Sequence, residues 1–440
     1  MAGDNRKPLQ PTQAESGLVE LFAARRISGD NLPSLCAEAF EAFQAKGLPS
    51  RREEAWKYTD LRSLMRDVKP LATPPEPAAK ELAREAGLLK ETGFRRIVFV
   101  GGYFAPELSD LQDIEEGLSI GSLSEALATQ DSFAASYLGK IYPAEDSAFA
   151  LNTAFMSEGV VVRVRPGATI ERPLHFVFVA NATQPATYFL RSLVVVEKGA
   201  RATFIESFEG ADQCDYHVNA ATEMVVGEEA RVERIKISRE GDQALHVSTL
   251  VATLAQNARL NDFALTIGGS LVRNQTFVKL EGRGAAANLR GANILAGKEH
   301  ADSTLLLDHA VEGSESKALF KSVLDDDSQA VFQGKIRVRP AAQHTDARMM
   351  ARALLLSGAA QAICKPELEI FADDVQCGHG STVGALDQEL KFYLMARGIA
   401  EADAVGLLVE AFIGETLDGI EHSSVRDHMT SLVAELNERK

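Results

Sequence analysis

Cys377 and His379 are the residues of this chain whose types and spacing point most directly to chemistry. They stand two positions apart in the run Cys377-Gly-His-Gly-Ser-Thr-Val-Gly384, and residues two apart in an extended backbone point to the same side. A thiolate and an imidazole are soft to borderline ligands that suit iron, zinc or copper better than calcium or magnesium. Two ligands do not complete a metal site, so a metal held here needs ligands from elsewhere, including from another chain.

A simpler interpretation of the same pair stays open, because a cysteine near the end of a strand often serves as a small buried apolar residue. Apolar and charged residues alternate in the preceding run Lys365-Pro-Glu-Leu-Glu-Ile-Phe-Ala-Asp-Asp374, which predicts a strand. We expect this strand to deliver Cys377 and His379 onto one side of a glycine-flanked turn.

The other thiols and imidazoles form few clusters. Cysteines 36, 214 and 364 are expected to be buried thiols, and none belongs to a Cys-x-x-Cys pair. Four cysteines in 440 residues are too few for a disulfide framework, which favours a reducing, cytoplasmic location. Most histidines, among them His300, His309, His422 and His428, are expected to be surface residues or satisfied core residues.

Composition excludes several classes of protein. The formal net charge of -16 argues against binding nucleic acid or an anionic membrane, since both need a basic surface. No run of about 18 apolar residues and no signal-peptide pattern occurs, so we expect a chain that neither crosses a membrane nor is exported. A chain of 440 residues is long for one core, so two or three structural regions are expected.

A short phrase recurs through the middle of the chain, in which a small residue follows a polar turn and opens an alternating strand. Its positions are Ala168, Ala200, Ala230, Ala258, Ala287 and Ser316, at spacings of 32, 30, 28, 29 and 29 residues. A near-constant period with strands on both sides of a turn predicts a β-solenoid, in which equivalent strands stack and supply one another's core. The period does not show whether one repeat is one long coil or two short ones, and a β-sandwich with hairpins of similar length is the alternative.

The flanks of the repeats show helical patterns, as expected of regions that cap a solenoid. Residues 17–26 and 31–46 are predicted helices, residues 95–100 a strand, and Asp387 the N-cap of a C-terminal helical region. We therefore predict an N-terminal helical and mixed region over 1–150, a β-helix core over 151–384 and a C-terminal helical domain over 385–440.

The C-terminal helices carry apolar residues at helical spacing, with Val405, Leu408 and Phe412 on one and Val425 to Leu436 on the next. Most of these residues are expected to pack onto the solenoid. Residues 385–440 contain 11 acidic against 5 basic residues, so exposed parts of this region favour a basic partner.

Several kinds of active site are missing from the sequence. No P-loop is present, so this chain is not expected to bind a nucleotide itself. The runs Asp325-Asp-Asp327 and Asp373-Asp374 do not form paired acids, because adjacent residues of a strand point to opposite faces. A β-helix carbohydrate-active enzyme remains an alternative, although the single tryptophan, Trp56, lies outside the repeats.

Four blocks of the sequence share a pattern with one known family. They are Glu54-Ala-Trp-Lys-Tyr-Thr59, Leu354-Leu-Leu-Ser357, the run from Lys365 to Gly384, and Phe392-Tyr-Leu-Met-Ala-Arg-Gly-Ile399. Together they resemble the SufB/SufD family of the SUF iron–sulfur cluster assembly machinery. The Cys-Gly-His-Gly sequence resembles the SufD branch of the family more than the SufB branch. In contrast, Met349, Met350 and Ala351 depart from the family's pattern.

The resemblance implies a right-handed parallel β-helix flanked by helical regions, and a scaffold subunit rather than an enzyme. It implies pairing with a SufB-type paralogue, and docking of a SufC-type ABC ATPase onto the C-terminal helices. His379 and Cys377 would then be metal ligands at the interface with the paralogue, where a transient iron–sulfur cluster is shared. A homodimer through the same surface is expected when the chain is alone. A standalone metal-binding protein is the remaining alternative, and two ligands in one place argue against it.

Overall fold

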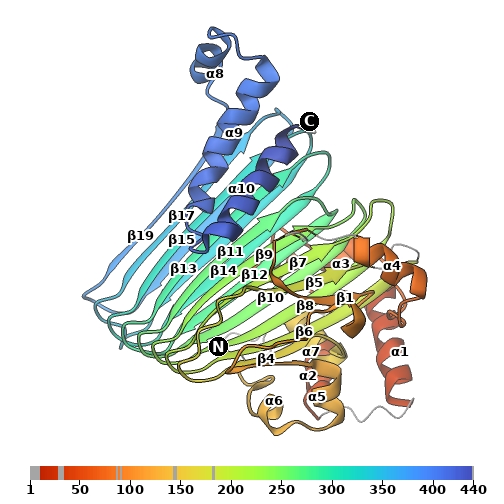
Figure 1. Cartoon of the computed structure of the whole chain (residues 1–440). Helices are drawn as coiled ribbons and strands as arrows, with labels where there is room; N and C mark the ends of the chain where they lie inside the picture. The colour runs from red at the N-terminus through yellow and green to blue at the C-terminus, as the bar shows by residue number, and fades with distance from the viewer. Residues whose placement is uncertain are drawn as a thin grey trace.

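The chain folds around a parallel β-solenoid (Figure 1). The structure is a computed structural model that describes residues 10–27, 34–85, 88–89, 92–141, 146–180 and 184–438. Within these residues the strands form one sheet of ten and one sheet of nine, and from β4 (Val160–Val164) onward sequential strands alternate between the two sheets. One repeat is therefore one coil with a strand in each sheet, and the predicted fold class is confirmed.

The sheets are joined by hydrogen bonds between parallel strands, except at the antiparallel pairs β1–β2 and β3–β4 at one end. The ten-stranded sheet contains β1 (Arg95–Val100), β2 (Tyr103–Phe104), β5 (Leu174–Val179), β7 (Arg201–Glu209), β9 (Arg231–Arg239), β11 (Arg259–Thr266), β13 (Ala286–Leu295), β15 (Glu315–Leu324), β17 (Asp346–Leu355) and β19 (Gln376–Ala385). The nine-stranded sheet contains β3 (Leu118–Ser122), β4 (Val160–Val164), β6 (Ala186–Val196), β8 (Tyr216–Val226), β10 (Leu245–Leu254), β12 (Leu271–Leu280), β14 (His300–His309), β16 (Gln329–Val338) and β18 (Gln361–Ile370).

One turn of each coil explains the recurring phrase. Its left-handed position is occupied in successive coils by residues that tolerate a positive φ, and a small buried residue follows. The left-handed residues are Gly199, Glu229, Asn257, Gly284, Gly313 and His344. Ala200, Ala230 and Ala258 follow this position as predicted, with no exposed surface. The next two equivalents are Ala285 and Ser314, so the predicted positions Ala287 and Ser316 were two residues out of register.

Side chains from both sheets fill the lumen of the solenoid with a continuous apolar core. Successive coils contribute neighbouring members of this core, such as Phe204, Val232 and Leu260. Polar groups inside the lumen are paired: Arg234 donates to Glu206 and to Asp262 at 2.6 and 2.7 Å. Each coil therefore depends on the next coil to cover its side chains.

Helices of the N-terminal region pack on both sheets and on one another. They are α1 (Gln13–Ile27), α2 (Ser34–Lys46), α3 (Leu61–Leu64), α4 (Pro77–Glu85), α5 (Leu123–Ala128), α6 (Ser132–Tyr137) and α7 (Ser147–Phe155), with short 3-10 turns at Glu54–Trp56 and Pro106–Leu108. The predicted helix over 17–26 lies within α1, and the strand over 95–100 is β1. The prediction over 31–46 matches α2, although its residues 31–33 lie outside the described part.

Three helices follow the solenoid, namely α8 (Gln388–Met395), α9 (Glu401–Leu417) and α10 (Ser423–Glu438). Asp387 caps α8 as predicted, accepting hydrogen bonds from the backbone N–H of Glu389 and Leu390. The apolar faces of α9 and α10 cover the outer face of the ten-stranded sheet, whereas α8 projects beyond its edge (Figure 1). None of the described helices is both long and apolar enough to cross a membrane.

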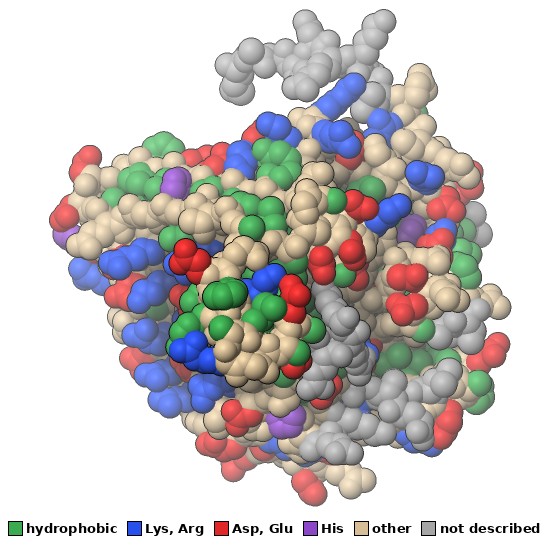
Figure 2. All heavy atoms as spheres, turned by 90° about the horizontal axis from the view of Figure 1, so that it is seen from above, with side chains coloured by type: hydrophobic (Ala, Val, Ile, Leu, Met, Phe, Trp, Pro, Cys, Tyr) green, Lys and Arg blue, Asp and Glu red, His purple; other side chains and the backbone are tan. Residues whose placement is uncertain are grey.

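The surface seen from above carries charges of both signs (Figure 2). Acidic and basic side chains are interspersed over most of this view, while Lys and Arg side chains gather along one side.

Candidate functional site

The candidate ligands lie on β19, the last strand of the ten-stranded sheet. Strand β19 pairs with β17 in parallel, which places Cys377 beside Ala347 and His379 beside Met349. Ala347 and Met349 are buried in the lumen core, so Cys377 and His379 occupy lumen-facing positions of the last coil. The prediction that both side chains point the same way agrees with this register, but they lie on a strand and not on a turn.

The two ligands differ in exposure. Cys377 is half-buried against the lumen core, and burial raises the pKa of its thiol above the ordinary value. The His379 side chain is exposed because no further coil lies over it. The thiol therefore becomes a better ligand only when a cation or a metal stabilises its thiolate form.

This end of the solenoid is uncovered. Strands β18 and β19 are the last strands of their sheets, and their outer edges present unpaired backbone groups. Large apolar side chains are exposed here as well, with Ile370 40%, Phe371 62% and Val383 48% accessible. The opposite end, in contrast, is closed by antiparallel strands and helices.

The described residues hold no group of three or more His, Cys, Asp or Glu side chains arranged to bind a metal ion. Cys377 and His379 thus remain an incomplete ligand set. Cys364, which was predicted to be buried, is half-buried on β18 and packs against the lumen core. Cys36 and Cys214 are buried as predicted.

The remaining candidates have structural roles. His309 is buried and bonded through both ring nitrogens to Ser314 and Ser316, at 2.7 and 2.9 Å. His300 contacts Thr59 at 3.2 Å. The aspartate runs at 325–327 and 373–374 lie in turns, as expected of solvated residues.

Helix α8 carries a second exposed apolar surface. Leu390, Phe392, Tyr393 and Met395 are 51%, 72%, 52% and 38% accessible, and the structure buries none of the residues of α8. The packing that was predicted for the apolar residues of α9 and α10 is confirmed. No such packing was predicted for α8.

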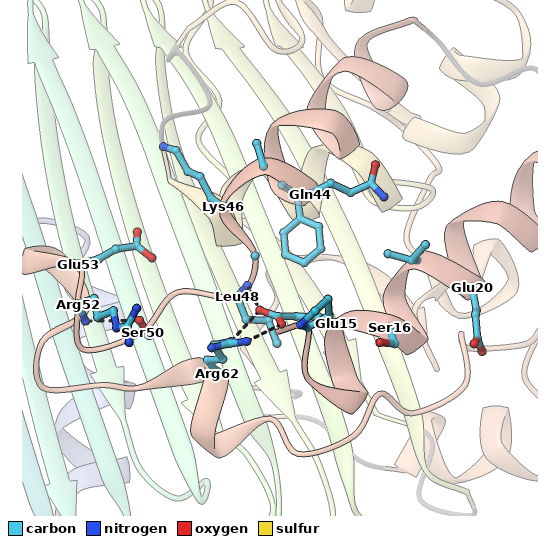
Figure 3. Close-up of a pocket in the computed structure, with 15 residues that line it drawn as sticks. Glu15, Ser16, Glu20, Gln44, Lys46, Leu48, Ser50, Arg52, Glu53 and Arg62 are labelled. Atoms are coloured by element: carbon cyan, nitrogen blue, oxygen red, sulfur yellow. Dashed lines mark hydrogen bonds and ion pairs between the residues drawn. The ribbon is translucent and has the colours of Figure 1, made fainter. Parts of the chain in front are cut away.

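One cavity lies away from Cys377 and His379. It has a volume of about 920 Å³ between α1, α2 and the segment that follows α2. Figure 3 shows Arg62 and Glu15 joined across its floor, where the guanidinium Nε donates to the carboxylate at 3.0 Å. Glu15 also accepts a hydrogen bond from the backbone N–H of Leu48 at 2.9 Å. These contacts tie α1 to α3 and to the segment that follows α2.

The block from Glu54 to Thr59 ties the N-terminal region across the nine-stranded sheet. The guanidinium of Arg273 stacks on the ring of Trp56 at 3.8 Å and donates to the carbonyl of Ala55 at 2.7 Å. Glu54 forms an ion pair with Lys365 on the edge strand β18. The sequence marked this block only through the family resemblance, because contacts between residues more than 200 positions apart leave no local pattern.

The fold and the site together define a β-solenoid protein in which helical regions precede and follow the repeats along the chain. An incomplete ligand set lies at the uncovered end of its solenoid. The family model for the SUF system FeS cluster assembly SufBD core domain matches residues 178–412, and that for the SufBD protein N-terminal region matches residues 23–176. The chain belongs to the SufBD family.

Relatives of similar length support this membership. The chain is 32% identical over 399 residues to an iron–sulfur cluster assembly SufBD family protein of Synechocystis, covering 88% of this chain and 87% of the relative. It is 27% identical to the iron–sulfur cluster assembly protein SufD of Escherichia coli, covering 88% and 89%. It is 26% identical to the chloroplastic protein ABCI7 of Arabidopsis thaliana, covering 94% and 88%.

Proposed function

We propose that this chain is a non-enzymatic scaffold subunit of the SUF machinery, on which an iron–sulfur cluster is assembled and then released. Membership of the SufBD family places the chain in iron–sulfur cluster assembly. The observation that carries the finer proposal is the position of Cys377 and His379 at lumen-facing positions of an uncovered terminal coil.

The uncovered end favours a partner that completes both the solenoid and the ligand set. A SufB-type paralogue packed against β18 and β19 would cover Phe371 and Val383 and contribute the missing ligands. The cluster is then a cargo shared between the two subunits, and imidazole ligation makes such a site more labile than one built of four thiolates. A scaffold needs this lability because it must release what it assembles.

The exposed surface of α8 supports docking of a SufC-type ABC ATPase. Phe392 and Tyr393 are aromatic residues of the kind that anchor protein interfaces, and they lie on a helix of which the structure buries no residue. Nucleotide chemistry would come from that ATPase, since this chain has no P-loop.

Three further parts of the proposal rest on the same features. In the absence of the paralogue, two copies of this chain would pair through the uncovered end. The low cysteine content favours a cytoplasmic location. One relative, ABCI7 of Arabidopsis thaliana, is named as a chloroplastic protein. The division at residues 150 and 385 into N-terminal region, core and ATPase-docking domain also belongs to the proposal.

The proposal is tested by anaerobic visible absorbance of the complex of this chain with its SufB-type and SufC-type partners. We expect the wild-type complex to carry an iron–sulfur chromophore, and the His379→Ala complex to assemble but lose most of it. The matched control is His344→Asn, which removes an exposed imidazole from a turn and keeps a residue type that tolerates the positive φ of this position. An equally coloured His379→Ala complex would show that the cluster lies wholly on the paralogue.

A further inference from the structure

The recurring phrase of the sequence places arginines on the outside of the solenoid. Arg201, Arg231 and Arg259 open β7, β9 and β11, and they lie side by side in the parallel register of the ten-stranded sheet. All three side chains are exposed. Adjacent strands are about 4.8 Å apart, so these guanidinium groups form a ladder of like charges.

Toward the uncovered end the row of these three arginines is continued by Ala286, Glu315 and Asp346, and basic residues return in the neighbouring row. Lys317 on β15 and Arg348 on β17 are paired in register, exposed, and two positions further along their strands. We call these five residues, Arg201, Arg231, Arg259, Lys317 and Arg348, the basic stripe. From β7 to β17 it crosses five strand spacings, about 24 Å. Lys and Arg side chains gather along one side of the molecule in Figure 2.

The basic stripe lacks the ion pairs that neighbouring cations make. Within the described part of the chain, no carboxylate lies at ion-pair distance from Arg201, Arg231, Arg259 or Lys317, and only Arg348 pairs, with Asp346. In the turns beside the stripe, Lys198 pairs with Glu228 and Arg283 with Glu312.

Stability of the fold does not account for this pattern. Like charges directly opposite one another on adjacent strands are destabilising. The chain has 62 acidic residues against 46 basic ones, so acidic partners are abundant in its composition. Glu233, two positions after Arg231 on β9, is committed to the start of α10, because its carboxylate accepts hydrogen bonds from the backbone N–H of Glu421 and of His422.

We propose that the basic stripe is the docking surface for an acidic segment of a partner protein, rich in Asp and Glu. Guanidinium groups bind carboxylates through paired hydrogen bonds, and arginine is enriched at interfaces for this reason. An extended segment of about seven residues spans the stripe. A phosphate backbone fits less well, since the net charge of -16 repels a long polyanion over the rest of the surface.

The stripe leads to the candidate site. Arg348 pairs in register with Gly378, which lies between Cys377 and His379. A partner bound along the stripe would therefore reach the uncovered end from the outer face of the ten-stranded sheet. The inference goes beyond the proposed function and does not depend on it, because it requires no cluster at Cys377 or His379.

The test is fluorescence anisotropy with the full chain and a fluorescein-labelled peptide of ten glutamates. We expect the wild type to bind this peptide, and binding to weaken as salt is raised. The triple variant Arg201→Gln, Arg231→Gln, Arg259→Gln is expected to lose about tenfold or more in affinity. Its thermal unfolding is expected to stay unchanged or shift upward, because the repulsion has been removed.

The matched control is the triple variant Lys198→Gln, Lys279→Gln, Arg283→Gln, which removes the same number of positive charges from cations that are already paired. It is expected to keep its affinity within about twofold. An equal loss in both triple variants, or no binding by the wild type, would overturn the proposal. Tighter binding of a ten-nucleotide thymidine strand than of the peptide would overturn the assignment to a protein partner.

Discussion

Buried histidines are kept neutral by the solenoid. Burial lowers the pKa of His309 from 6.5 to about 4. Its ring nitrogens contact the hydroxyl groups of Ser314 and Ser316, so the neutral ring is satisfied without a carboxylate partner. His217 and His246 have pKa values lowered to about 4 and His175 to about 3, in each case chiefly by burial.

These shifts predict an acid-sensitive fold. Between pH 6.5 and about 4 the unfolded chain binds protons that the folded chain does not, so stability is complete above pH 6.5 and is lost as the pH falls. His309 alone should account for roughly 2 kcal/mol between about pH 7.5 and about pH 5. Urea unfolding of His309→Gln should show a pH dependence reduced by about that amount. An unchanged slope in His309→Gln would contradict the prediction.

The face of the candidate site could be predicted from sequence, but its local structure could not. Cys377 and His379 share a face because the side-chain period of a strand is two. The glycines around them favoured a turn, yet pairing with β17 keeps this segment extended. Gly380 is explained by packing, since a Cβ there would lie 2.8 Å from the side-chain Cε of Met350. That contact joins two strands and has no signal in the local sequence.

At the scale of elements, the repeat predicted the coils because the left-handed turn position recurs. The predicted repeat position was two residues out of register at Gly284-Ala-Ala-Ala287, because any of the three alanines could be the small residue of the repeat. A slip of two residues keeps every side chain on its correct face, so alternation alone could not reveal the error. The packing of α9 and α10 followed from their apolar spacing, whereas α8 shows a comparable pattern with no surface to cover it.

Helix α8 provides the prediction at this scale. Phe392→Ser combined with Tyr393→Ser should change the free energy of unfolding by less than about 0.5 kcal/mol, because both side chains are largely exposed. The same variant should weaken binding of the SufC-type ATPase by about tenfold or more, since exposed aromatic residues commonly dominate an interface. Isothermal titration calorimetry measures the affinity. Leu407→Ser, at an exposed position of α9, is the control, and a double variant that binds like wild type would exclude α8 as the docking surface.

At the scale of the whole molecule, the two ends of the solenoid are unlike. Every internal coil is covered on both sides by neighbouring coils, while the coil of β18 and β19 is covered on one side. Stability in a solenoid is a sum of contributions from each repeat and its contacts with neighbours, so this last coil should open most readily. Hydrogen exchange, measured without the paralogue and at a dilution at which the chain is monomeric, should therefore be faster in β18 and β19 than in β10 and β11.

A partner that packs on this end should cover the last coil and make it open less often. Addition of the SufB-type paralogue should slow exchange in β18 and β19 and leave the opposite end unchanged.

Phe371→Glu introduces a charge at a position whose side chain is 62% exposed, so the chain should fold normally. Pairing with the paralogue should weaken, with a dissociation constant raised by about tenfold or more. Self-association of the chain alone, measured by sedimentation, should be lost in the same variant because both pairings use this surface. Leu64→Glu, an exposed leucine of α3 that is not on β18 or β19, is the matched control. Pairing that survives Phe371→Glu, together with protection that appears at the N-terminal helices, would place the subunit interface at the other end of the solenoid.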